Sequence, residues 1–293
     1  MTIIAILLAF ALRHFVPELG RFSQDRWLRR WVDAANDMLS SLPGWSGATG
    51  FLLIIALPLV LLLLVNQVLI SLLGSVGAFV LAIAVLIACF GPRDLDTEVA
   101  AIVEEEDPEQ RQEAVEELAG GPVPDDVEAG RAAAVESVFQ AALRRWFGVI
   151  LWFAVLGIAG AFVYRFVDWL VETDCPLADE QRDLFRRMRQ VMDWPAAQLM
   201  TLSLAIATDF DSVFQAWKSF HDEQGHGLFE GDNGFLLAAA RSVVFSGHAA
   251  RDGYADQLDG PMRGVQQAMD LTWRMLGVWV TVLAILLLVG VIV

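Results

Sequence analysis

The most informative feature of this sequence is its lack of charge over long stretches. No charged side chain occurs between Asp37 and Arg93, a gap of 55 residues, and none occurs from Val278 to Val293. A helix that crosses a bilayer needs about 20 apolar residues, so the first stretch is long enough for two crossings. The mean hydropathy of +0.52 agrees with this interpretation. The chain is therefore an integral membrane protein, which excludes disordered, coiled-coil and disulfide-scaffold classes.

The scarcity of cysteine, of known catalytic motifs and of positive charge excludes several functional classes. There are two cysteines, Cys89 and Cys175, without Cys-x-x-Cys spacing, so we expect free thiols rather than a zinc site or a disulfide. The glycine-rich nucleotide motifs and the Gly-x-Ser-x-Gly elbow of serine hydrolases are absent. The net charge of −16 argues against a nucleic-acid partner, because phosphate binding needs clustered Lys and Arg.

Most of the negative charge lies in one segment. Residues 93–143 hold fifteen Asp or Glu and three Arg, which gives −12 of the total −16. Residues 104–118 have a helical pattern that ends at Gly120-Gly121-Pro122. We interpret the segment as a solvated acidic loop with one exposed helix. An acidic docking site for a protein partner is the alternative.

The apolar segments predict an all-α, polytopic membrane helix bundle. We expect four spans, a shorter N-terminal span, and a short apolar helix at 195–209 that follows Asp193-Trp194-Pro195. Residues 1–92 then hold the N-terminal span, an amphipathic Arg/Trp loop and a hairpin. Residues 93–143 are the acidic loop, 144–270 are a core with one span and polar loops, and 271–293 are the last span. The short N-terminal span and the four full spans are predicted at Ile3–Leu12, Phe51–Leu73, Val76–Phe90, Trp146–Leu170 and Leu271–Val293.

Arginines set the expected orientation. Five of them follow the first apolar segment, at positions 13, 21, 26, 29 and 30. The positive-inside rule then places the N-terminus in the periplasm and residues 93–143 in the cytoplasm. If residues 195–209 cross the membrane, residues 210–270 face the cytoplasm, which we favour; otherwise they face the periplasm. We recognise no internal repeat, which argues against the transporters built from inverted repeats.

Two groups of polar residues are candidates for a site. Arg165 and Asp168 lie three residues apart near the end of a predicted span, where charge is costly and often functional. They could instead pair only with each other and reach the interface. Glu136, Gln140 and Arg144 share one face of the helix predicted at 129–145, although such a stripe can also be an ordinary exposed face.

A metal site is less well supported. Residues 221–232 contain His221, His226 and several carboxylates, but the two histidines are five residues apart and do not share a helix face as in His-Glu-x-x-His. Three glycines in the same stretch indicate a flexible loop. We therefore expect a polar loop here and no metal.

Several short motifs occur between residues 128 and 242. They are Arg131-Ala132, Val135-Glu136-Ser137-Val138, Gly157, Gly160-Ala161, Tyr164-Arg165, Asp193-Trp194-Pro195-Ala196, Trp217, and Asn233-Gly234 with Leu237-Ala238-Ala239-Ala240. This pattern resembles the CobD/CbiB–AmpE superfamily of bacterial inner-membrane proteins, with Gln198 where Arg is usual. The CbiB branch forms an amide bond in cobalamin assembly with ATP.

The sequence departs from the synthase branch at one place. That branch continues Val-Glu-Ser-Val with Glu-Asn-Thr-Val-Asp-Gly, whereas this chain has Gln-Ala-Ala-Leu-Arg-Arg at 140–145. The carboxylates that would hold a divalent cation are gone. The Arg/Trp-rich first loop, the Pro17–Arg21 entry and the large acidic loop resemble the AmpE branch instead. AmpE is linked to β-lactamase induction and the sensing of cell-wall turnover.

The resemblance implies a regulatory or sensor protein of the inner membrane without catalytic residues, metal or cofactor. We expect a pocket for an anionic metabolite or lipid, since guanidinium binds such groups in a two-pronged way. A residual amide-forming synthase, an assembly protein that docks through residues 93–143, and a transporter are the alternatives. The pocket would use Glu136, Gln140, Arg144, Tyr164, Arg165, Asp168, Trp194, Trp217 and Asn233.

Overall fold

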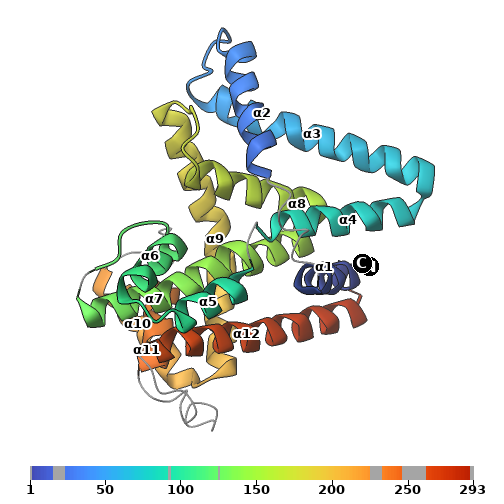
Figure 1. Ribbon diagram of the computed structural model, residues 1–293. Coiled ribbons are helices and arrows are strands. Elements are labelled where there is room, and N and C mark those ends of the chain that lie inside the picture. Colours follow the sequence, from blue (N-terminus) through green and yellow to red (C-terminus); the bar gives the residue numbers. More distant parts are fainter. Residues whose placement is uncertain are drawn as a thin grey trace. The chain divides into compact units, whose positions relative to one another are not determined.

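The computed structural model describes residues 2–15, 24–91, 94–124, 126–224, 233–245 and 262–290. All regular elements in these ranges are helical, as predicted (Figure 1). The contacts divide the chain into two compact units. The first combines Met1–Arg93, Gly148–Met192 and Gly290–Val293, and the second combines Asp94–Phe147 and Asp193–Val289. Each unit is thus assembled from segments that are far apart in the sequence.

Three helical segments are long and apolar enough to cross a membrane, as expected for a membrane helix bundle. They are Ala48–Leu73, Arg263–Leu288 and the helical run Val127–Glu172, which contains the reversal at Gly157 described below. Three shorter helices are also apolar: Ile3–Arg13, Ser75–Cys89 and Gly234–Phe245.

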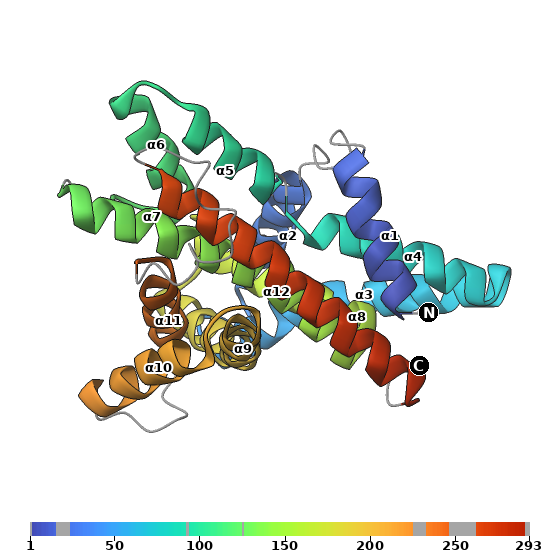
Figure 2. The same cartoon turned by 90° about the horizontal axis from the view of Figure 1, so that it is seen from below.

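The first unit is built around a helical hairpin, with α3 joined to α4 at Gly74 (Figures 1 and 2). Helices α1 and α8 pack on α4, and α2 packs on α3. The core contains Ile54, Phe166 and Phe185, all nearly inaccessible to solvent. The helices of this unit are α1 (Thr2–Phe15), α2 (Gln24–Leu39), α3 (Ala48–Leu73), α4 (Ser75–Cys89), α8 (Gly148–Glu172) and the first part of α9 (Asp179–Ala207).

The segment predicted as a single span at 146–170 is a second hairpin, so that prediction is wrong. Gly157, inside α8, has φ 63° and ψ −148°, almost the values of Gly74 (63° and −147°). Glycine adopts this conformation without the steric cost that a Cβ brings. Tyr164 packs directly against Gly148, which shows that the chain reverses at Gly157. In a straight helix these residues would lie about 24 Å apart.

The two hairpins are copies of one motif. Residues 73–80 read Leu-Gly-Ser-Val-Gly-Ala-Phe-Val and residues 156–163 read Leu-Gly-Ile-Ala-Gly-Ala-Phe-Val. In both, a Cβ on the second glycine, Gly77 or Gly160, would collide with a backbone carbonyl of the other arm. Both return arms have 15 residues, 75–89 and 158–172. Our expectation of no internal repeat is therefore wrong, and the repeat was missed because the similarity is confined to the turn.

Helix α2 is amphipathic, as predicted, and packs on the first hairpin. Leu28 and Val32 are buried on one face, while Trp27 is half exposed. The indole Nε1 of Trp31 donates a hydrogen bond of 3.1 Å to the carbonyl oxygen of Ile54. That carbonyl lies four residues before Pro58, which has no N–H to donate to it. A side chain from α2 thus replaces the helix bond that the proline removes.

A polar cap joins α2 to the loop before α9. Asn36 Nδ2 donates to the carbonyl of Pro176 at 2.6 Å, and Asn36 Oδ1 accepts from Trp45 Nε1 at 2.9 Å. Arg29 donates to the carbonyl of Asp174 at 3.2 Å. Residues 173–178 therefore lie on the same side of this unit as α2. Cys89 and Cys175 are both buried and free, as expected.

The second unit is arranged around α7, and most residues in the second half of this helix are buried. Helices α5, α6, α11 and α12 pack on it, and α10 packs on α11. A π-helical turn, Leu143–Phe147, follows α7. The helices are α5 (Leu95–Glu104), α6 (Pro108–Ala119), α7 (Val127–Ala142), the second part of α9, α10 (Phe210–Gln224), α11 (Gly234–Phe245) and α12 (Arg263–Leu288).

The acidic segment forms two helices before α7 rather than one exposed helix in a loop. Leu95, Val99 and Ile102 of α5 and Val115 of α6 are buried. Asp107 caps α6 by accepting from the backbone N–H of Glu109 at 3.0 Å. The prediction missed α5 because its apolar positions are interspersed with carboxylates.

Candidate functional site

The first candidate site is a buried ion cluster in the first unit. Asp168 is inaccessible to solvent, and its Oδ2 accepts from Arg165 at 2.7 Å. Its Oδ1 lies 3.7 Å from a guanidinium nitrogen of Arg189, which α9 supplies. Both arginine side chains are less than one-fifth exposed. Two guanidinium groups therefore surround one carboxylate, and the three groups together carry one formal positive charge.

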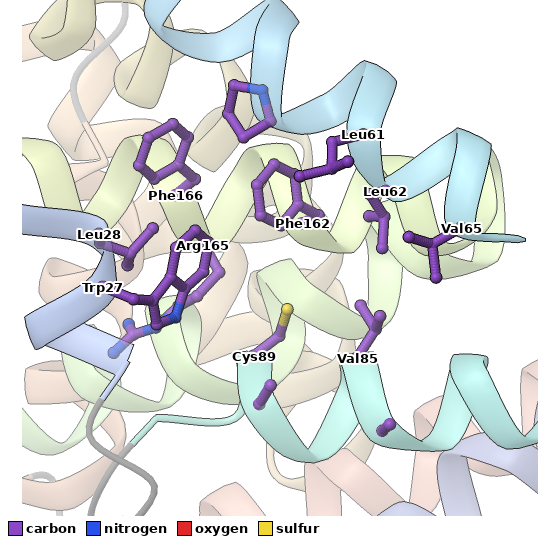
Figure 3. Close-up of a pocket in the computed structure, with 13 residues that line it drawn as sticks. Trp27, Leu28, Leu61, Leu62, Val65, Val85, Cys89, Phe162, Arg165 and Phe166 are labelled. Carbon is purple, nitrogen blue, oxygen red and sulfur yellow. The ribbon is translucent and has the colours of Figure 1, made fainter. Parts of the chain in front are cut away.

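Arg165 also lines a cavity of about 360 Å³ (Figure 3). Twelve of its thirteen lining residues are uncharged, and Arg165 provides the charge. Side chains come from both arms of the first hairpin, from the return arm of the second, and from α2. Arg165 and Trp27 lie toward one end of the group in Figure 3, and Val65 lies toward the other. The cavity is thus apolar with one polar end.

The second candidate site is the polar face of α7 in the second unit. Glu136 Oε1 lies 2.8 Å from Nε of Arg241 on α11. The amide of Gln140, oriented with its oxygen toward Arg144, accepts from Nε at 3.0 Å and from Nη2 at 2.8 Å. The next residue, Arg145, pairs with Glu98 of α5 at 2.6 Å. Glu136, Gln140 and Glu98 therefore each have an oxygen atom bound to a guanidinium group.

This face does not fit a metal-bound nucleotide. A divalent cation needs several oxygen ligands that are not already committed to cations. Here Glu136 and Gln140 both accept from arginine. No group of three His, Cys, Asp or Glu residues that could hold a metal occurs within the described ranges.

Other predicted site residues take separate places. Tyr164, buried, packs against Gly148 across the second hairpin. Trp194 lies partly buried on α9 beside Pro195. Trp217 contacts His221 with ring centroids 4.3 Å apart and the ring planes tilted by 39°.

The loop considered for a metal lies mostly outside the described residues, since 225–232 are not described. His221 Nδ1 donates to the carbonyl of Trp217 at 2.7 Å. Asn233, which follows that loop, has a buried Oδ1 without a hydrogen-bond partner in the part of the chain described here. The prediction for Asn233 stays a prediction.

The predicted pocket residues fall into both units. Tyr164, Arg165 and Asp168 belong to the first, and Glu136, Gln140, Arg144, Trp194, Trp217 and Asn233 belong to the second. The structure brings Arg165 together with Asp168, and Gln140 with Arg144. The single nine-residue pocket stays a prediction.

Sequence reasoning missed two arginines. Arg241 is the one charged residue in the apolar helix α11, a signal that could have pointed to a partner. Arg189 had no such signal, because it is one of four arginines in the first part of α9. Only the fold distinguishes Arg189 from the others, by its distance to Asp168.

Comparison with known proteins gives one match. Searches of curated proteins and of solved structures found no match to this chain. A family model described as CobD/Cbib protein matches residues 6–172. The match includes both hairpins, α7 and the buried pair Arg165–Asp168, and ends before the landmarks at 193–240. Because it spans more than half of the 293 residues, the chain belongs to the CobD/Cbib protein family.

Proposed function

We propose that this chain is a regulatory or sensor member of its family that binds an anionic ligand and performs no amide-forming reaction. The proposal places it with AmpE-like proteins, which are linked to β-lactamase induction and cell-wall turnover. The alternative is a synthase of the cobalamin pathway, the process with which the family is linked.

The polar face of α7 carries the proposal. In the synthase branch two carboxylates follow the Val-Glu-Ser-Val motif, whereas here Gln140 and Arg144 occupy those positions. Gln140 is bonded to Arg144, and Arg145 to Glu98. A cation bound there would have to displace arginines and would meet their positive charge. An anion is the chemically matched ligand for such a face.

Partial burial strengthens these pairings. The side chains of Arg145 and Glu98 are 20% and 17% exposed, so solvent screens them less than a surface pair. Opening the pair would leave two poorly solvated charges. The arginine arrangement is therefore a stable part of the fold rather than a mobile obstruction.

Complementation tests the proposal. The chain is expressed in a strain that lacks the cobalamin-pathway synthase, and a functional synthase serves as the positive control. We expect no restoration of cobalamin-dependent growth, although immunoblotting shows the protein in the membrane. Growth equal to that of the positive control would overturn the proposal.

A second measurement tests the regulatory side. Deleting the gene in a host with an inducible β-lactamase should change the enzyme level reached after exposure to a β-lactam. Reintroducing the intact chain should restore the original level. An unchanged induction curve in the deletion strain would contradict the regulatory role.

A further inference from the structure

We propose that the cavity of the first unit binds one acyl chain of an anionic membrane lipid, with the lipid headgroup at Arg165. This inference names the ligand class of the proposed regulator, and to that extent it rests on the proposed function.

The wall of the cavity suits a hydrocarbon chain. Pro58 and Leu62 of α3, Val85 and Ala88 of α4, and Phe162 of α8 are among its residues. A small polar metabolite would leave its hydrogen-bonding groups unsatisfied against such a wall, which is unfavourable. An acyl chain has no such groups and gains by leaving water or detergent.

The charged end suits an anionic headgroup. Arg165 lines the cavity, and it shares Asp168 with Arg189. The two guanidinium groups and the one carboxylate together carry a formal charge of +1. A phosphate near Arg165 would compensate this charge and accept charge-assisted hydrogen bonds.

The cavity can be reached from the lipid side. Leu61 is 63% exposed and Val65 is 42% exposed, on an uncharged helix long enough to cross a membrane. Both residues line the cavity. In a bilayer these side chains lie against acyl chains, so a lipid could enter sideways without crossing water.

The repeat shows that the charges are specific to one hairpin. Aligning Gly74 with Gly157 places Arg165 opposite Ala82 and Asp168 opposite Val85. The first return arm keeps small or apolar residues at both positions, so the hairpin fold does not require the charges. A buried pair that one copy has and the other lacks therefore points to a role in binding rather than in folding.

Native mass spectrometry of the full chain in mild detergent tests the site. The probes are phosphatidylglycerol and phosphatidylcholine with identical acyl chains, and inorganic phosphate alone. We expect phosphatidylglycerol to bind at least about tenfold more tightly than phosphatidylcholine, because both carry the same phosphate but the quaternary ammonium of phosphatidylcholine is repelled by the positive cluster. We expect no binding of phosphate alone, because it gains nothing from the apolar wall.

Two kinds of variant locate the site. Val85→Trp and Ala88→Phe fill the cavity and should abolish binding of both lipids, whereas Val80→Trp changes an exposed residue of the same helix outside the cavity and should bind like the parent. Arg165→Gln leaves Asp168 with Arg189 and should remove the preference for phosphatidylglycerol. Arg165→Lys should retain part of it. Circular dichroism and thermal unfolding identify variants that do not fold.

Three outcomes would overturn the inference: equal binding of the two lipids, unchanged binding in both folded cavity-filling variants, or phosphate binding as tight as that of phosphatidylglycerol. The last result would assign the cluster to a free anion. Failure of the proposed function is distinguishable, because a chain that complements the synthase strain and still prefers phosphatidylglycerol refutes only the regulatory proposal. A chain that does not complement and shows no lipid preference refutes only this inference.

Discussion

The bond between Trp31 and Ile54 gives a sharp test of how the first unit is held together. Trp31→Phe keeps an aromatic ring on α2 but removes the N–H that donates to the Ile54 carbonyl. Pro58 cannot supply a replacement donor, so the carbonyl is left unsatisfied. A polar group left in this way in an apolar region costs about 1–3 kcal/mol.

A second substitution separates this cost from lost packing. In Pro58→Ala, the alanine N–H can close the ordinary helix bond to the Ile54 carbonyl, so Trp31 is no longer needed as donor. Trp31→Phe should then cost only the smaller contact area of phenylalanine. The coupling between the two positions should be about 1–2 kcal/mol.

Thermal unfolding in detergent measures the cycle. At about 2 °C per kcal/mol, Trp31→Phe should lower the Tm by about 2–6 °C in the parent chain, and by about 2–4 °C less in the Pro58→Ala background. Trp27→Phe is the matched control, because Trp27 lies on the same helix and is half exposed. An equal decrease in both backgrounds would refute the proposed replacement of the helix bond.

Three further predictions concern other contacts. Gly148→Ala places a methyl group against the buried ring of Tyr164 and should destabilise the fold by about 1–3 kcal/mol. The double variant Gly148→Ala/Tyr164→Leu should recover this stability. Destabilisation that persists in the double variant would argue against the contact. Arg241→Ala should cost less than about 1 kcal/mol in chemical denaturation, because the Arg241 side chain is half exposed, and a loss above twice that value would contradict this. Burial raises the pKa of the Cys175 thiol above its usual 9.0, so the contribution of the neutral thiol to stability is complete below pH 9 and is lost as the pH rises above that value. The free energy of unfolding, measured from pH 7 to 10.5, should therefore fall more steeply in the parent than in Cys175→Ala. Parallel curves for the two proteins would refute this prediction.

The helical class could be predicted because charge-free stretches of this length leave few alternatives. The charge-free gap between Asp37 and Arg93 and the glycine at position 74 predicted the first hairpin with nearly the helix bounds that the structure shows. The second hairpin was missed because Gly157 lies inside an unbroken apolar run. A hydropathy pattern does not show that the φ angle of one glycine is positive. Only comparison with the sequence around Gly74 would have revealed it.

The candidate site was less predictable than the fold. The pair Arg165–Asp168 could be found because the two charges lie one helical turn apart in an apolar segment. Arg189 comes from another helix, and its selection depends on packing that no local pattern records. The cavity was not predictable either, since leucine and valine line cavities and fill cores with the same sequence pattern.

The equal length of the two return arms has a consequence for the surrounding lipid. An arm of 15 residues rises about 22 Å, which is less than the roughly 30 Å thickness of a typical hydrocarbon layer. Lipids beside these arms must compress or tilt to avoid exposing acyl chains to water. The protein should therefore be a local source of hydrophobic mismatch, and its stability should depend on bilayer thickness, with short-chain lipids favoured.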